Sequence, residues 1–184
     1  MDNARVAFRR LRVLLAVLLV VLTAGCGVVE KLAGRKGFRS GSEVMEPTIR
    51  KGQYFTVRTV DEDYVPKAGE VVLYRPPAYW SDQTPRPSAD VRVSRVIGVP
   101  GSYVSCCDAT GKVVVNGRSL PEPYVSARPA SAMDFEVDVP PGRIWIMGDN
   151  RDVSLDSRAY QNATGHGTIA ISDVVGVVDD IGPN

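Results

Sequence analysis

The stretch Ser42-Glu43-Val44-Met45-Glu46-Pro47-Thr48, named here the serine box, stands just past an N-terminal apolar segment and before a long region of β-type sequence. From Gln53 onward, short apolar runs alternate with turn residues, and no window keeps a helical period long enough for a substantial helix. The chain beyond the serine box is therefore predicted to be a mainly β domain.

Several of these runs are rich in β-branched and aromatic residues, which predicts strands. They cover residues 54–57, 70–74, 91–97, 112–115 and 143–147. Asn116-Gly117 predicts a tight hairpin, because both residues tolerate positive φ. Trp145 lies in an apolar run and is predicted to be core. The segment from Trp80 to Asp90 is interrupted by prolines and is predicted to be an exposed loop, on which Trp80 could contact a membrane or a peptide.

Length and charge narrow the function classes. The 184 residues allow one domain plus a leader. Lys and Arg total 22 against 21 Asp and Glu, a net charge of +1, so no nucleic-acid partner is expected. The cysteine and histidine side chains that could bind a metal are few and scattered along the chain, so neither a metal nor another cofactor is predicted. They are Cys26, Cys106, Cys107 and His166.

Residues 1–26 are predicted to be an export signal. A basic region precedes the apolar run from Val13 to Leu22, which is shorter than the roughly 20 residues of a membrane span. The run ends in Leu22-Thr23-Ala24-Gly25-Cys26, which resembles a bacterial lipobox, and Cys26 would then carry lipid. The alternative is an uncleaved N-terminal membrane anchor, because residues 27–29 extend the apolar run.

Both alternatives keep the N-terminal arginines in the cytoplasm and place the rest of the chain outside the membrane. Residues 27–37 would then be a short tether, and residues 38–184 the β domain. The membrane is accordingly a predicted partner.

Two further motifs follow the serine box. The base box is Ser94-Arg95-Val96-Ile97-Gly98-Val99-Pro100-Gly101-Ser102. The C-terminal box is Gly148-Asp149-Asn150-Arg151-Asp152-Val153-Ser154-Leu155-Asp156-Ser157-Arg158. The Gly- and Asx-rich turns of the C-terminal box predict a loop folded against the strand of the base box, with Asp156 and Arg158 as a charged pair.

Taken in this order, the boxes resemble those of signal peptidase I, a family of membrane serine peptidases that use a serine nucleophile and a lysine base. The resemblance covers roughly residues 38–178, and Cys106-Cys107-Asp108 with the run from Val113 to Tyr124 is similar to actinobacterial members. It implies a coiled antiparallel β-sheet domain that acts on exported preproteins. The matching positions are Met45, Pro47, Thr48, Arg95, Gly148, Asp149, Asn150, Arg151, Ser154, Asp156, Ser157 and Arg158.

The two catalytic positions of the family pattern hold other residues in this chain. Val44 stands at the nucleophile position and has no atom that can attack a carbonyl. Ser94 stands at the base position, and a hydroxyl has too high a pKa to act as that base. Ser42 matches the first serine of the box, whose side chain helps form the oxyanion hole in active relatives. The pattern predicts a non-catalytic relative whose groove still binds extended peptides.

A rival alignment makes Ser42 the nucleophile and treats Glu43 and Val44 as an insertion before Met45. The insertion falls at the tightest point of the site, where about 1 Å of misplacement can cost 100-fold in rate. It also leaves the base unexplained, because every lysine lies outside the base box. These lysines are Lys31, Lys36, Lys51, Lys67 and Lys112.

Three functions follow. The chain is predicted to be a signal-peptidase-like pseudoenzyme that binds exported peptides or a partner. The alternatives are an active serine endopeptidase that uses Ser42, and a structural lipoprotein without peptide binding. Met45 is expected to pack inward or to seat the domain on the bilayer, and His166 to be a loop residue. Cys106 and Cys107 are expected to form either a vicinal disulfide or two thiols that are free or paired elsewhere.

Overall fold

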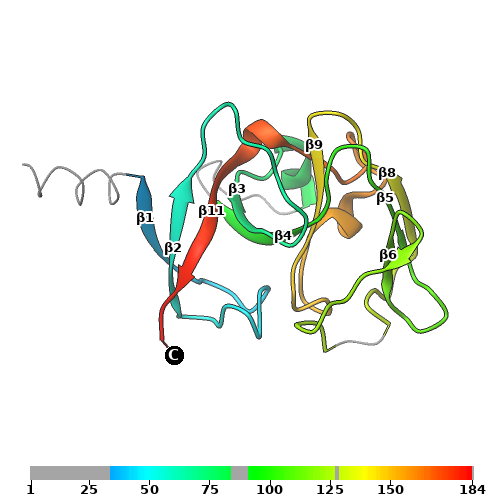
Figure 1. Cartoon of the computed structure of the whole chain (residues 1–184), viewed down its shortest axis with the longest axis horizontal. Coiled ribbons are helices and arrows are strands. Elements are labelled where there is room, and N and C mark those ends of the chain that lie inside the picture. Colours follow the sequence, from blue (N-terminus) through cyan, green and yellow to red (C-terminus); the bar gives the residue numbers. More distant parts are fainter. Residues whose placement is uncertain (1–33, 84–90, 127–128, 184) are drawn as a thin grey trace, which may run out of the picture. The chain divides into compact units, whose positions relative to one another are not determined.

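The computed structural model describes residues 34–83, 91–126 and 129–183 (Figure 1). The described strands belong to a compact unit spanning Lys36–Asn184, apart from the first residue of β1. The strands are β1 (Arg35–Arg39), β2 (Tyr54–Thr59), β3 (Val71–Tyr74), β4 (Arg92–Gly98), β5 (Tyr103–Cys106), β6 (Val113–Val115), β7 (Arg118–Ser119), β8 (Phe135–Asp138), β9 (Arg143–Met147), β10 (Ile169–Ala170) and β11 (Val174–Ile181). Three 3₁₀ helices accompany them: η1 (Ala78–Gln83), η2 (Ser157–Tyr160) and η3 (Ile171–Asp173).

The strands form two sheets whose registered pairs are antiparallel. The larger has the order β1-β2-β11-β3-β4-β9-β10, and the smaller has the order β7-β6-β5-β8. Figure 1 shows the smaller sheet beyond β9. The prediction of a mainly β domain is confirmed. Within the ranges described, no helix is long and apolar enough to cross a membrane.

Strand β9 joins two hydrophobic clusters because alternate side chains of a strand point to opposite faces. Ile144 and Ile146 pack into the cluster that contains Trp80 and Tyr160. Trp145 and Met147 pack into the cluster under the smaller sheet. All four residues are fully buried, which explains why the strand reads as a continuous apolar run and confirms that Trp145 is core.

The predicted strands are all present, and Asn116 and Gly117 adopt φ values of 50° and 76° between β6 and β7, as predicted for the hairpin. Sequence analysis missed β11, which pairs with both β2 and β3. Gly176 allows this pairing, because a Cβ there would lie 2.4 Å from Val57 Cγ1 and 2.5 Å from the carbonyl oxygen of Arg58.

The prediction of an exposed Trp80 was wrong. Trp80 lies in η1 and is 0% exposed, with its ring stacked on Tyr160 at a centroid distance of 4.4 Å and edge-on to Tyr74. Burial of the indole beneath the sheet outweighs the turn character of its neighbours in sequence. Residues 84–90 of the predicted loop lie outside the described ranges.

Candidate functional site: a groove between the serine box and the C-terminal box

The serine box is a turn that two apolar side chains anchor. Met45 and Ile49 are both fully buried, in the cluster that contains Phe55, Val57 and Leu73. The Ile49 N–H donates to the Met45 carbonyl at 2.9 Å, which closes the turn. Met45 therefore packs inward, as the first of its two alternatives predicted. Between these anchors and β1, Ser42 and Glu43 are exposed and Val44 is half-buried.

The C-terminal box holds the serine box in place through the backbone. The Asn150 N–H donates to the Val44 carbonyl at 3.1 Å, and the Asn150 side-chain amide donates to the Glu43 carbonyl at 3.2 Å. The two segments approach so closely at Gly148 that a Cβ there would lie 2.6 Å from the Val44 carbonyl oxygen. These contacts explain why the box needs glycine at position 148.

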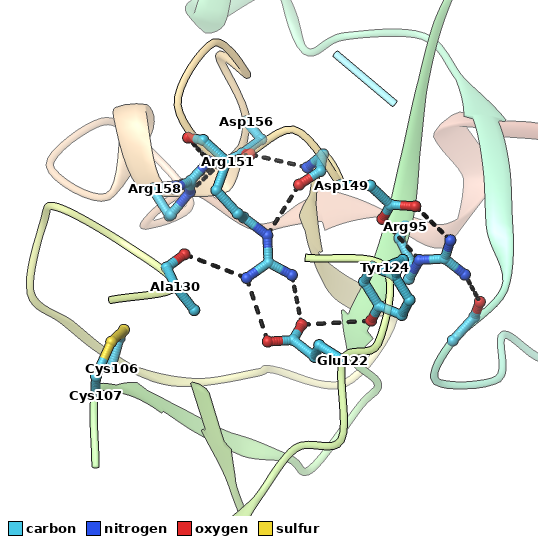
Figure 2. Close-up of polar contacts among 12 residues, drawn as sticks. Arg95, Cys106, Cys107, Glu122, Tyr124, Ala130, Asp149, Arg151, Asp156 and Arg158 are labelled. Carbon is cyan, nitrogen blue, oxygen red and sulfur yellow. Dashed lines mark hydrogen bonds and ion pairs between the residues drawn. A yellow bond between two sulfur atoms is a disulfide. The ribbon is translucent and has the colours of Figure 1, made fainter. Parts of the chain in front are cut away.

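Arg95 ties the base box to both other motifs, and Figure 2 shows its contact with Asp149 of the C-terminal box. Its guanidinium donates to Asp149 Oδ1 at 2.8 Å and to Thr48 Oγ1 at 3.2 Å, and Thr48 in turn donates to Asp149. The Arg95 guanidinium also lies 4.0 Å above the ring of Tyr124. Burial disfavours the charged form, but the hydrogen bonds and charge of Asp149 outweigh it and raise the pKa of Arg95.

Asp156 and Arg158 form the predicted charged pair. Asp156 accepts two hydrogen bonds from the Arg158 guanidinium, each 2.8 Å long, and a third from the Gly148 N–H at 2.9 Å. Arg158 also donates to the Arg151 carbonyl at 3.0 Å, and Ser157 accepts the Ile146 N–H at 2.9 Å. Because both charged side chains are buried and fully engaged, the C-terminal box is a folded structural unit rather than an open loop.

Sequence reasoning missed Glu122, which is buried and paired with Arg151 (Figure 2). Arg151 also donates to the Gly148 carbonyl at 2.9 Å and to the Ala130 carbonyl at 3.3 Å. The only signal was the position of Glu122 between two prolines, and that pattern does not identify a partner. The pair fastens the segment after β7 to the C-terminal box.

A groove of about 400 Å³ opens beside these motifs, and we name it the serine-box groove. It is lined by residues 38–42, 44, 55, 73–74, 91–94 and 153–155. It brings together Ser42, Val44 and Ser94, the positions singled out from the sequence. Val44 is half-buried, and Ser94 is 2% exposed. Within the described ranges, no lysine lines the groove.

Among the described residues, one strand edge along the groove has no neighbouring strand over part of its length. Strand β4 pairs with β3 from Arg92 to Arg95, but with β9 only from Arg95 onward. In the described part of the chain, the backbone of residues 92–94 therefore has no registered strand partner on the β9 side. Such an edge can add an extended peptide as a further strand.

Cys106, Cys107 and His166, which the sequence analysis considered, lie outside the groove lining. Cys106 and Cys107 form a vicinal disulfide at the end of β5, which decides between the two alternatives. His166 is an exposed turn residue with φ of 49°, as expected. Cys26 and the leader lie outside the described ranges.

Comparisons with known proteins agree with the motif resemblance. The family model described as signal peptidase, peptidase S26, matches residues 10–181. Signal peptidase I of Mycobacterium tuberculosis is 33% identical over 178 residues, covering 73% of this chain and 60% of that protein. The probable signal peptidase I of Mycobacterium leprae is 30% identical, covering 73% of this chain and 64% of that protein.

This chain thus spans about 60% of the length of the mycobacterial relatives. A crystal structure of signal peptidase I from Enterococcus faecalis is 24% identical, with a TM-score of 0.46, and covers 63% of this chain and 98% of that one. On the family match and the mycobacterial identities, this chain belongs to the signal peptidase family.

Proposed function

We propose that this chain is a signal-peptidase-like pseudoenzyme that binds extended segments of exported proteins in the serine-box groove without cutting them. The observation that carries the proposal is the groove lining: Val44 and Ser94 both face it, and no lysine of the described residues does. Such a site would keep the family motifs beside the groove without the serine and lysine that react in the family pattern.

Chemistry supports the loss of activity. Serine peptidases need a nucleophile and a neighbouring base that accepts its proton. The described lysine closest in sequence to the serine box, Lys51, is exposed and forms an ion pair with Glu43 at 3.1 Å. A solvated, paired ammonium is poorly suited to accept a proton, so Lys51 does not supply Ser42 with an activating base.

Two features favour retained binding. The groove is lined by apolar side chains that include Phe38, Val44, Leu73 and Leu155, which suit the apolar residues of an export signal. The edge of β4 at residues 92–94 offers backbone groups to an extended chain. Ser42 and the N–H of Val44 would retain the oxyanion hole and would hold a peptide carbonyl there.

The basic residues that precede the N-terminal apolar run would place this domain on the outer face of the membrane. Residues 1–26 would supply the anchor, as a lipidated Cys26 or as an uncleaved helix. Either anchor would keep the groove near the exit of translocated chains.

The test uses the full chain in liposomes with a preprotein that carries an Ala-x-Ala cleavage site. Cleavage is compared among the native chain, Ser42→Ala, Val44→Ser/Ser94→Lys and the matched control Val44→Ala/Ser94→Ala. We expect the native chain and the control to be inert and the Ser/Lys variant to gain activity. Cleavage by the native chain that disappears in Ser42→Ala would show an active enzyme with a displaced nucleophile.

Binding is measured separately with a fluorescent signal-peptide segment. Leu155 is 55% exposed and lines the groove, so Leu155→Glu is expected to weaken binding without unfolding the domain. Val65 is 74% exposed and lies outside the groove lining, so Val65→Glu is the matched control. Absence of binding by the native chain would favour a structural lipoprotein instead.

A further inference from the structure

The polar lining of the serine-box groove consists of cations and neutral hydroxyl groups. Arg39 and Arg92 line it together with serine and tyrosine side chains. Within the described ranges, no Asp or Glu lines it, and neither arginine lies within ion-pair distance of a carboxylate. The groove therefore carries positive charge that this part of the chain does not neutralise.

Both arginines are held by aromatic neighbours. The Arg39 guanidinium lies 4.3 Å above the ring of Tyr54, and Arg92 interacts with the buried Tyr74. Stacking and a single hydroxyl contact leave most guanidinium N–H groups available, since arginine has five donors. Arg92 also lies on the open edge of β4, where an added peptide strand would pass.

Ser94 supplies a third donor. It is 2% exposed and lines the groove, and none of the described residues hydrogen-bonds its hydroxyl. Because Ser94 lines the groove, a ligand bound there could accept a hydrogen bond from this hydroxyl in place of water. The residue at the family's base position thus presents an unused donor two residues from Arg92, and alternate strand residues share a face.

We propose that the serine-box groove selects an extended peptide that carries a carboxylate and binds that carboxylate with Arg92 and Ser94, with Arg39 adding positive charge. The inference rests on the proposed peptide-binding function and names its ligand class. A neutral extended peptide would bind only through the edge of β4 and the apolar side chains of the groove. A carboxylate also receives charge-assisted hydrogen bonds, which are roughly twice as strong as neutral ones. Its source is either a free C-terminus, as in a peptide already cleaved, or an acidic side chain.

The test measures dissociation constants by fluorescence anisotropy with the full chain in liposomes. Three peptides share one apolar sequence ending in Ala-Ser-Ala: one ends in a free carboxylate, one in an amide, and one in an amide with a single internal Asp. We expect at least one carboxylate peptide to bind about tenfold tighter than the neutral amide. The peptide that shows the gain identifies the source of the carboxylate.

Variants of the groove residues test whether the groove causes the tighter binding of the carboxylate peptides. Arg92→Gln should reduce the carboxylate preference, the ratio of the dissociation constants of the neutral and carboxylate peptides, to about onefold, and Ser94→Ala should reduce it severalfold. A thermal midpoint equal to that of the native chain shows that each variant folds. Arg118→Gln, on the exposed β7 and outside the groove, should leave the preference intact.

The outcomes separate the two proposals. If no peptide binds, the proposed function fails. If all three peptides bind equally, or if Arg118→Gln abolishes the preference as fully as Arg92→Gln, peptide binding stands and the carboxylate inference is wrong.

Discussion

The backbone N–H of Asn150 donates to the carbonyl of Val44 at 3.1 Å, and this contact sets the position of the serine box relative to the C-terminal box. The Asn150 side chain repeats the link at Glu43. Two segments far apart in sequence thus form one wall of the groove through backbone contacts that depend little on the side chain at position 44. This explains how the arrangement can persist with a valine at the nucleophile position.

Gly148→Ala should disrupt this wall. A Cβ at position 148 would lie 2.3 Å from Ser154 Oγ and 2.6 Å from the Val44 carbonyl oxygen, so the serine box must shift. Overpacking of this kind costs about 1–3 kcal/mol, which urea unfolding would detect. Gly37→Ala is the control, since a Cβ there meets nothing within 4 Å, and an equal loss in both variants would contradict the packing argument.

Glu122→Ala should destabilise the domain by about 3–5 kcal/mol, because Arg151 would remain buried without its carboxylate. Glu43→Ala removes an exposed pair with Lys51 and should cost less than about 1 kcal/mol. Denaturant unfolding of each variant and of the native chain measures both losses of stability. A small loss for Glu122→Ala would mean that Arg151 finds another partner or reaches water.

Trp80→Ala should cost about 3–5 kcal/mol, because the fully buried indole stacks on Tyr160 and packs edge-on against Tyr74. Tyr103→Ala removes a ring that is 38% exposed and serves as the aromatic control. The thermal midpoint of each variant checks the comparison, and a near-native midpoint for Trp80→Ala would place the indole in solvent.

Ser94→Lys should introduce a lysine with a lowered pKa, because position 94 is 2% exposed and burial penalises the ammonium form. The unfolded chain would then bind more protons than the folded one between the two pKa values, so stability of the variant should rise with pH from 7 towards 10. Urea unfolding across this range, compared with the native chain, measures the slope. A flat difference would show that the ammonium reaches water.

Asp108 should contribute to acid sensitivity. The hydroxyl of Ser119, the N–H of Lys112 and the hydroxyl of Thr110 donate to its carboxylate and lower the pKa of Asp108. Its contribution is present above the unfolded pKa and is lost as the pH falls towards the folded value. Asp108→Asn should therefore lose less stability than the native chain between pH 5 and pH 2, as measured by thermal unfolding. An identical loss in both proteins would exclude this carboxylate as a cause.

The sequence by itself determined the mainly β class, the paired Asp156 and Arg158, and the family, because these depend on local composition and on ordered motifs. Strand β11 escaped prediction because Val174–Ile181 gains its place only by pairing with two distant strands. The tertiary structure alone decided that Trp80 is buried, that Glu122 is the partner of Arg151, and that Arg92 and Ser94 line one groove. Burial, shared cavities and ion pairs such as that of Arg151 with Glu122 are relations between residues far apart in sequence, and spacing along the chain does not encode them.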